Sequence, residues 1–418
     1  MKHTVLLWLL AASLAASTAA QAQPAATMSC PQAEWAKAGD ILMHTPGSEL
    51  FNGVIHPTAA LFENYFDVDK AAAEHEHYIR MLEQNGIRVH RVTDILAEVG
   101  IDSLRMLAAK VLTYDISGIA GESVEQTEAY RQEVLAQMSR ADLIRCILLQ
   151  PTVQLARTDN NTGYESHYVQ NPLMNLYFTR DQSISTPRGH VIGRMNSSQR
   201  APETDLISLC YEHLGLKPIL RIEGDGRLEG GDYIPAGTLS LIGCGMRTND
   251  EGIRQLMEAD AFGHDTIVVV RDHKRWQMQM HLDTHFNLID RDLCTMVRSR
   301  LEARPGQPES TPCYICVLKP GRRKYSLWKR DLSFVGFLKS RGFQIIPIDY
   351  ADEMHYANNF LTIAPRHIMA VGGQSEALQQ RLREAGVRVE WIPLESLIGG
   401  YGAAHCMTQV LRREAQDQ

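Results

Sequence analysis

The pattern that most restricts the fold of this chain is a repeated unit, in which a helix-like run ends in glycine and leads into an alternating apolar strand. Glycine is the usual left-handed end of a helix, because it adopts positive φ without steric cost. The strand after it can then pack beside the strand that precedes the helix. The clearest examples are residues 80–85 before Gly86, 335–341 before Gly342 and 380–385 before Gly386.

Two further segments follow the same scheme less cleanly. They are 204–214 leading to 217–222, and 251–260 leading to 266–270. Strand-like runs precede the units, for example at 41–44, 238–242 and 361–364. Five strand, helix, strand units predict an α/β fold. Their irregular spacing leaves open whether the units close into a ring or form an open sheet.

Residues from about 94 to 157 interrupt this scheme with successive amphipathic helices, predicted at 102–112, 123–138 and 139–149. Ser123 and Gln126 have the spacing of a helix capping box. We therefore expect a helical insertion that packs against the repeats or against a neighbouring subunit. The polar sequence 159–163 is predicted to be a flexible loop that could cover a functional site.

One cysteine near the end of the chain lies in the glycine-rich sequence GGYGAAHCMT at 399–408, which would present the sulfur of Cys406 to a small molecule. A thiol has a pKa of about 8.5 and needs a nearby base or cation to become a good nucleophile. Three upstream clusters offer a histidine and several carboxylates. They are NLYFTRD at 175–181, EGGD at 229–232 and HLDT at 281–284.

The carboxylates in these clusters indicate the kind of substrate. Asp181, Glu229 and Asp283 around a thiol would raise its pKa and oppose its activation, unless the substrate itself brings positive charge. A guanidinium brings that charge, and its planar fork of N–H donors pairs with carboxylates. Attack at its central carbon would expel an amine, and hydrolysis would then leave a urea.

In this order the four clusters resemble those of arginine deiminase, within a superfamily of guanidino-modifying enzymes that includes agmatine deiminases, dimethylarginine hydrolases and amidinotransferases. The resemblance extends from GDILMHTPG at 39–47 to Cys406. It implies a five-fold pseudosymmetric α/β propeller (pentein) with a helical-bundle insertion, and so favours the ring. It also implies hydrolysis of L-arginine to L-citrulline and ammonia through a covalent cysteine amidino-thioether, without a cofactor.

The resemblance implies a role for each matching residue. The implied catalytic residues are Cys406 as nucleophile, His281 as general acid and base, Glu229 as a partner that orients His281 or the substrate, and Asp181 and Asp283 as guanidinium ligands. The implied ligands of the amino-acid end are Asn175, Phe178, Arg200 and Arg247. The family usually has another arginine five residues before the nucleophile. Tyr401 stands there in this chain and is expected to contact the substrate with one hydrogen bond instead of a charged fork.

Other interpretations stay open on the sequence alone. Cys406 could be a buried structural cysteine, Arg200 and Arg247 could form salt bridges, and Asp232 could form a turn or cap a helix. Another guanidino compound could be the substrate, as in agmatine deiminases or amidinotransferases, although agmatine has no carboxylate for the two arginines. The chain could also be a catalytically silent periplasmic protein that binds a guanidino compound.

The first 22 residues have the pattern of a secretory signal peptide. Lys2 precedes an apolar run over 4–14, and Ala20-Gln21-Ala22 is a small-residue cleavage sequence. The apolar run is too short to span a bilayer, which takes about 20 residues. We expect cleavage after about Ala22, a single catalytic domain over 23–418 and export to the periplasm or the medium.

Composition narrows the range of partners. A net charge of −7 argues against nucleic acid, which is bound through basic patches. No HExxH sequence or paired CxxC framework occurs, so no metal is predicted in spite of 16 histidines. Cys313 and Cys316 lie in a strand-like run and are expected to belong to the core. A homo-oligomer without a membrane span, acting on a small guanidino compound, is predicted.

Overall fold

The computed structural model describes residues 28–119, 121–318 and 324–415, and within them five sheets repeat one arrangement of strands. In each, a first strand runs antiparallel to a second, and the second runs parallel to a third. A crossover that contains a helix joins the second strand to the third. The repeated unit predicted from the sequence is therefore present five times. The predicted signal peptide, 1–22, lies outside the described residues.

The first unit combines both ends of the described chain, because the last strand pairs with an early one. Its strands are β21 (Gln409–Glu414), β2 (Ala38–Met43) and β3 (Arg88–Arg91), with β1 (Met28–Ser29) added beside β21. The second and third units are β7 (Ser183–Thr186), β8 (Gly189–Ile192) and β9 (Leu220–Arg221), then β10 (Tyr233–Pro235), β11 (Ser240–Cys244) and β12 (Thr266–Arg271). The fourth and fifth are β13 (Phe286–Asp290), β14 (Leu293–Val297) and β17 (Gln344–Ile348), then β18 (Leu361–Ala364), β19 (His367–Val371) and β20 (Arg388–Ile392).

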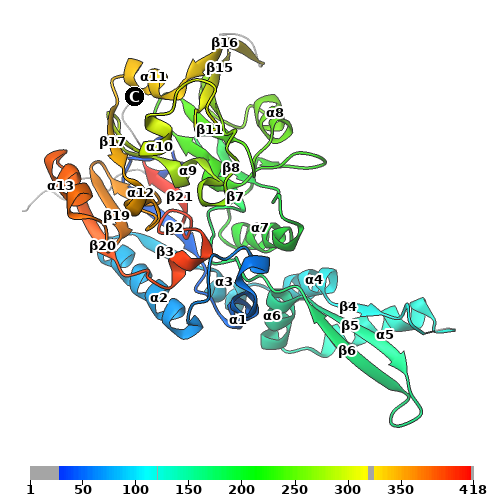
Figure 1. The fold of residues 1–418 in the computed structure, drawn as a ribbon. Coiled ribbons are helices and arrows are strands. Elements are labelled where there is room, and N and C mark those ends of the chain that lie inside the picture. The colour runs from blue at the N-terminus through cyan, green and yellow to red at the C-terminus, as the bar shows by residue number, and fades with distance from the viewer. Residues whose placement is uncertain (1–27, 120, 319–323, 416–418) are drawn as a thin grey trace, which may run out of the picture.

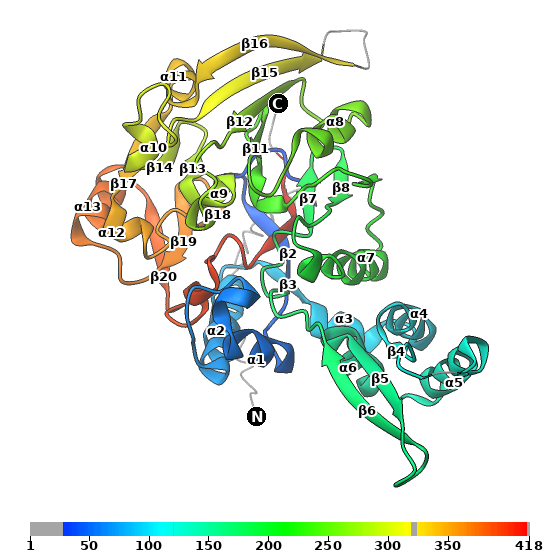
Figure 2. The ribbon, with the colours of Figure 1, turned by 45° about the vertical axis from the view of Figure 1, so that its right-hand side comes forward.

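The crossover helices lie on the outside of the molecule and the strands lie inside them (Figures 1 and 2). These helices are α1 (Ser48–Ile55), α2 (Val68–Gln84), α7 (Glu203–His213), α8 (Asp250–Glu258), α11 (Phe334–Ser340) and α13 (Glu376–Glu384). Gly86, Gly342 and Gly386 follow three of them with φ of 75°, 84° and 70°. The predicted helix stops are thus confirmed, since this backbone region favours glycine.

The crossover of the fourth unit carries a hairpin that joins a neighbouring sheet. The helix α10 (Arg298–Leu301) is followed by β15 (Pro312–Leu318) and β16 (Tyr325–Ser333), and β15 pairs antiparallel with β12. The third sheet thereby gains two strands. Cys313 and Cys316 lie buried in β15, as expected for core residues.

The segment between β3 and β7 contains helices and a small separate sheet. The helices are α3 (Val92–Glu98), α4 (Ile101–Val111), α5 (Val124–Gln137) and α6 (Arg140–Leu149), and the strands are β4 (Thr113–Asp115), β5 (Pro151–Arg157) and β6 (Tyr164–Gln170). The last three helices match their predicted ranges within one residue. The Ser123 hydroxyl caps α5 by accepting the Gln126 N–H.

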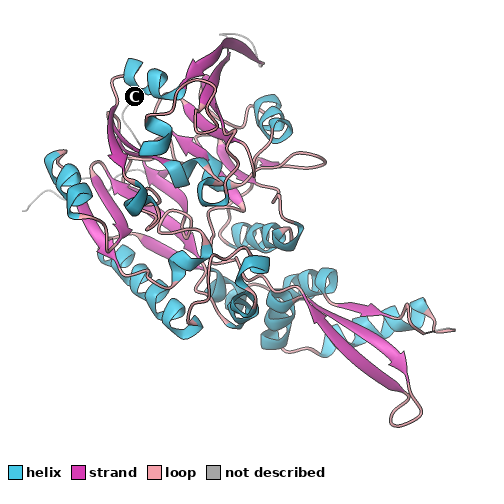
Figure 3. Cartoon of the chain, viewed as in Figure 1, coloured by secondary structure: helices cyan, strands magenta, loops and turns pink. Residues whose placement is uncertain are grey.

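Residues 158–163 form the tip of the β5–β6 hairpin. In the ribbon views and in Figure 3, this hairpin extends away from the five repeated sheets. The expectation that this loop covers the functional site is therefore wrong. A sheet of three strands holds the loop outward, and the strands β5 and β6 were not foreseen from the sequence. No helix among the described residues is long and apolar enough to cross a membrane.

One face of α2 illustrates how the crossovers pack onto the sheets. Ala71, His75, Tyr78 and Leu82 recur at helical spacing and are almost fully buried, together with Ile79. Apolar side chains at this spacing form a stripe that faces the core. Burial of each large apolar side chain contributes about 1.5–3 kcal/mol.

His75 on this face makes the fold sensitive to acid. Burial lowers the pKa of His75 to about 3, with smaller contributions from His44 and Arg91. Unfolded histidine titrates near pH 6.5, so between these values the unfolded chain binds more protons, and stability falls as the pH drops. We expect the titration of His75 to lower the free energy of unfolding by about 2 kcal/mol when the pH falls from 6.5 to 5. Urea unfolding at pH 6.5 and at pH 5 should show a smaller difference in unfolding free energy for His75→Gln than for the parent protein. An unchanged difference would contradict this assignment.

Candidate active site

The turn before the first strand of every unit carries polar residues, and these turns meet. The five turns contain Asp181 before β7, residues 229–232 before β10, residues 281–283 before β13, Asn359 before β18 and Cys406 before β21. Two of them are helical, as η3 (Gly230–Asp232) and α9 (Leu282–His285). The repeated fold therefore draws residues that are far apart in sequence to one place.

Five hydrogen bonds join these turns into a closed cycle. They run from Gly230 N–H to the Asp181 carbonyl (2.9 Å), Leu282 N–H to Asp232 Oδ1 (3.0 Å), Asn359 Nδ2 to the Asp283 carbonyl (3.4 Å), Cys406 N–H to Asn359 Oδ1 (3.1 Å) and Arg180 N–H to the Cys406 carbonyl (3.0 Å). Each turn is thus fixed to the turn of the next unit. Asp232, whose role was open, acts in this cycle as a cap for the start of α9.

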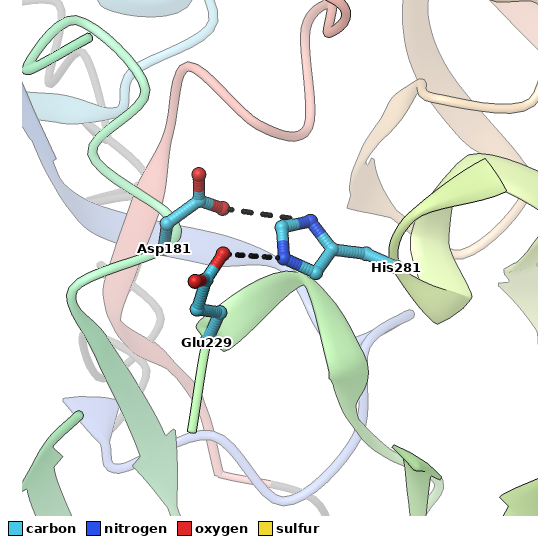
Figure 4. Close-up of side chains that lie close together, drawn as sticks. All are labelled: Asp181, Glu229 and His281. Atoms are coloured by element: carbon cyan, nitrogen blue, oxygen red, sulfur yellow. Dashed lines mark hydrogen bonds and ion pairs between the residues drawn. The ribbon is translucent and has the colours of Figure 1, made fainter. Parts of the chain in front are cut away.

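His281 lies between two carboxylates, as Figure 4 shows. Its Nε2 is 2.9 Å from Glu229 Oε2, and its Nδ1 is 3.8 Å from Asp181 Oδ1. Burial alone would lower the pKa of His281, but Asp181, Glu229 and Asp232 raise it to about 9. The imidazole is therefore a cation at neutral pH and can donate a proton.

The thiol of Cys406 is buried beside Asp283, with Sγ 3.7 Å from Oδ2. Burial, followed by the charges of Asp283 and Asp181, raises the pKa of Cys406 well above its ordinary value. This direction agrees with the sequence argument that crowded carboxylates oppose thiolate formation. The free protein therefore holds a protonated thiol, and a bound cation would lower the pKa of that thiol.

Three buried polar atoms of these turns have no hydrogen-bond partner among the described residues. They are Asp181 Oδ1, Asp283 Oδ1 and His281 Nδ1. A Cβ on Gly231 would lie 2.7 Å from His281 Nδ1 and 3.0 Å from Asp283 Oδ1, so only glycine leaves this space open. Buried polar atoms without a partner are costly, and a ligand with several N–H donors would satisfy both aspartates.

Comparison with known proteins places this arrangement in a family. The family model described as arginine deiminase matches residues 59–413. The chain belongs to the arginine deiminase family. Among curated relatives, the arginine deiminases of Halobacterium salinarum and of Lactococcus lactis subsp. lactis are each 26% identical to it. The alignments cover 91% of this chain and 96% and 97% of those proteins.

Solved structures of lower identity share the α/β fold. The dimethylarginine dimethylaminohydrolase of Pseudomonas aeruginosa, solved as a cysteine mutant with citrulline, aligns with a TM-score of 0.53 at 18% identity over 89% of this chain and 99% of that one. The N-terminal domain of ArgZ, covalently bound to a reaction intermediate, aligns with a TM-score of 0.54 at 15% identity over 90% and 98%. At such identities the likeness concerns the fold.

The arginines that the family resemblance assigns to the substrate carboxylate are engaged within the protein. Arg200 Nη1 lies 2.6 Å from Asp181 Oδ2, and its Nε and Nη2 donate to Glu203. Arg247 Nη2 donates to Gln277 Oε1, and its Nη1 is 3.9 Å from Glu229 Oε1. Their contact with a substrate stays a prediction, because binding would require one or both to exchange partners.

Asn175, Phe178 and Tyr401 are the other residues assigned to the substrate. The Asn175 amide donates to the Ala60 carbonyl at 2.9 Å, so one of its two N–H donors is already used. The ring of Phe178 packs against the backbone of Gly400 and Gly402, beside Cys406. Tyr401 follows η5 (Leu397–Gly400) with φ of 67°. It is partly exposed, whereas Asn175 and Phe178 are buried, so Tyr401 has the most accessible side chain of the three.

A buried chain of polar groups lies behind Asp283 and was not predicted from the sequence. His405 Nδ1 is 2.7 Å from Asp283 Oδ2, and its Nε2 is 3.4 Å from Glu34 Oε1. Arg413 donates to the same Glu34 oxygen. Burial alone would raise the pKa of Glu34, but Arg413 and His405 lower it to about 2. His405 directly precedes Cys406, and this adjacency was the available signal.

The cluster of Asp181, Glu229 and His281 also has the geometry of a metal site. One ligand atom from each lies within 4.8 Å of the others. A metal would have to displace the proton of a histidine whose pKa is raised to about 9. The expectation that the protein holds no metal stays a prediction.

The ion pairs of Arg200 predict a large effect on stability. Asp181, Glu203 and Arg200 are all buried, and Arg200→Met would leave two carboxylates without their partner. Breaking a buried pair in this way costs about 3–5 kcal/mol. Denaturant unfolding should show this loss, whereas Arg254→Met, which breaks exposed pairs on α8, should show a much smaller one. Equal losses would contradict a structural role for Arg200.

Proposed function

We propose that this protein is an arginine deiminase that hydrolyses L-arginine to L-citrulline and ammonia through a covalent intermediate on Cys406. One observation carries the proposal most directly. Asp181 and Asp283 each keep a buried carboxylate oxygen without a partner beside a protonated thiol. A guanidinium fits this pair by charge and by its planar set of donors. Membership of the arginine deiminase family supports the same reaction.

In the first half of the reaction, the guanidinium binds between Asp181 and Asp283 and its charge lowers the pKa of the Cys406 thiol. The thiol loses its proton to solvent, and the thiolate attacks the central guanidino carbon to form a C–S bond. His281 as imidazolium then donates its proton to one amino group, and the C–N bond breaks to release ammonia. The product is an amidino-thioether cation on Cys406.

In the second half, neutral His281 accepts a proton from water as the water oxygen attacks the same carbon. The C–S bond then breaks, the thiolate leaves, and the protonated urea gives its proton to that thiolate, which forms citrulline and restores the Cys406 thiol. Glu229 holds Nε2 of His281, so the imidazole keeps one orientation through both halves. Asn175, Phe178, Arg200, Arg247 and Tyr401 are proposed to bind the amino-acid end of the substrate.

Another guanidino compound is the second candidate substrate, and Tyr401 is the observation that favours it. A tyrosine forms no charged fork with a carboxylate, and Arg200 and Arg247 already have acidic partners. A substrate without a carboxylate, such as agmatine, would not need those arginines to exchange partners.

We also propose that the five units close into a five-fold pseudosymmetric propeller around this site, with residues from about 94 to 157 inserted into a single catalytic domain. The repeated strand pairing and the cycle of hydrogen bonds between the turns support this arrangement.

Export to the periplasm or the medium, after cleavage near Ala22, is proposed from the first 22 residues of the sequence alone. N-terminal sequencing of the exported protein would test it, and sedimentation would test the predicted homo-oligomer.

Product analysis tests the proposed function. The mature protein, purified under reducing conditions, is expected to convert L-arginine to equal amounts of citrulline and ammonia. Agmatine, assayed in parallel, should react much more slowly, because it lacks the carboxylate for Arg200 and Arg247. Faster turnover of agmatine would favour the second candidate. Absence of product from both compounds would contradict the proposed reaction.

A further inference from the structure

The turn of the fifth unit contributes an asparagine where the other four turns contribute residues already assigned to the reaction. Asn359 lies two residues before β18, and Asp181 lies two residues before β7. The equivalent turns before β10, β13 and β21 carry Glu229, His281 with Asp283, and Cys406. We infer that Asn359 is a positioning residue that holds the Cys406 nucleophile in place against Asp283. This inference rests on the proposed function.

The side chain of Asn359 connects the two neighbouring turns. Its Oδ1 accepts the N–H of Cys406 at 3.1 Å and the N–H of Ala403 at 2.9 Å. Its Nδ2 donates to the Asp283 carbonyl at 3.4 Å. The backbone carbonyl of Asn359 also accepts the N–H of His405 at 3.1 Å. One buried amide therefore fixes the backbone on both sides of the 3.7 Å contact between the Cys406 sulfur and the Asp283 carboxylate.

The other links in the cycle do not depend on a side chain in the same way. Two of the five bonds join backbone to backbone, and one uses Asp232. The remaining two both use the amide of Asn359. Loss of this amide would therefore remove the side-chain bonds that hold the N–H groups of Cys406 and Ala403. The backbone bond from His405 to Asn359 and the contact of His405 with Asp283 would remain, so the nucleophile turn would be loosened but not detached.

Electrostatics at the sulfur agree with this geometry. Burial, Asp283 and Asp181 raise the pKa of Cys406, and hydrogen bonding from Asn359 acts in the opposite direction. The amide carries no charge, so it favours the thiolate without competing for the guanidinium. An asparagine meets both requirements, whereas an aspartate would add a third negative charge beside the sulfur.

Asn358 provides a matched control. It is as buried as Asn359, at 1% exposure, and its Nδ2 also donates to the Asp283 carbonyl, at 3.3 Å. Its Oδ1, however, accepts the Thr295 hydroxyl, which lies in β14. The two residues thus share the burial and one partner, and they differ in the bond to the nucleophile turn.

The test compares Asn359→Ala with Asn358→Ala by kcat and KM for L-arginine, and by the rate at which iodoacetamide labels the Cys406 peptide at several pH values. Asn359→Ala is expected to lower kcat roughly 100-fold with KM within about threefold, because a displacement near 1 Å at the reacting atom costs about that much. Labelling of Cys406 in the Asn359→Ala variant should shift to higher pH. Asn358→Ala should keep kcat within about threefold and leave the labelling profile unchanged.

Equal losses of kcat in the two variants, or a change confined to KM, would overturn the inference. Where Asn359→Ala does not fold, Asn359→Asp keeps the acceptor for both N–H groups. Its added charge should move labelling of Cys406 to higher pH, and an unchanged profile would overturn the inference too. Labelling needs no turnover, so a parent protein that forms no citrulline would refute the proposed function and still allow this test.

Discussion

Replacing Cys406 by alanine is expected to lower citrulline formation by at least about 10⁴-fold, since removing the nucleophile of a catalytic cluster has effects of this size or larger. Binding should persist, because the two aspartates that receive the guanidinium are unchanged. Calorimetry with L-arginine and the Cys406→Ala variant should give an affinity within about tenfold of the KM of the parent protein, if KM reflects binding.

A second buried cysteine serves as the control for this variant. Cys294 lies in β14, is fully buried and is outside the cluster, and burial raises the pKa of Cys294 as well. Cys294→Ala should therefore retain turnover. If Cys406→Ala retained turnover, Cys406 would not be the nucleophile. A parent protein that binds guanidino compounds without turning any over would instead be the silent binder considered from the sequence.

The repeated fold could be predicted because its signal is local. A glycine at the end of a helix and an alternating strand after it need no knowledge of distant residues, and Gly86, Gly342 and Gly386 all adopt the expected conformation. The hairpin β15–β16 carries no such signal. Its pairing with β12 depends on which sheet edge is left open in space, and the outward direction of the β5–β6 hairpin likewise depends on tertiary pairing.

The sequence was enough to predict which residues form the site, but not which hydrogen-bond and salt-bridge partners each residue has. Family motifs name Cys406, His281 and the acidic residues, and the structure brings these together. Whether Arg200 faces a substrate or a neighbouring acid depends on Glu203, which lies only three residues away and belongs to none of the motifs. Asn359 could have been noticed as the polar residue before the first strand of the fifth unit, but the equivalence of the five turns emerges only once the sheets are paired.

Replacing His281 by glutamine is expected to lower kcat by about 10³-fold, within the range of general acid and base catalysis. The raised pKa of about 9 gives the parent protein a particular pH dependence. The imidazolium needed to expel ammonia is present below pH 9 and is lost above it, so the rate of ammonia release should fall as the pH rises through 9. His281→Gln should remove this dependence.

Rapid quenching separates the two halves of the reaction in this variant. Glutamine can neither donate a proton to the leaving ammonia nor accept one from water, so ammonia and citrulline should both form slowly and in equal amounts. Accumulation of a covalent adduct, seen as a mass increase at Cys406 with ammonia released ahead of citrulline, would mean that His281 serves only the hydrolytic half.

His190→Gln provides the control, because His190 is buried in β8 against Ser185 and contacts no residue of the cluster. Turnover within threefold of the parent is expected for this variant. Turnover of His281→Gln in that same range would show that another group moves the protons, and His405, already 2.7 Å from Asp283, would be the first residue to substitute.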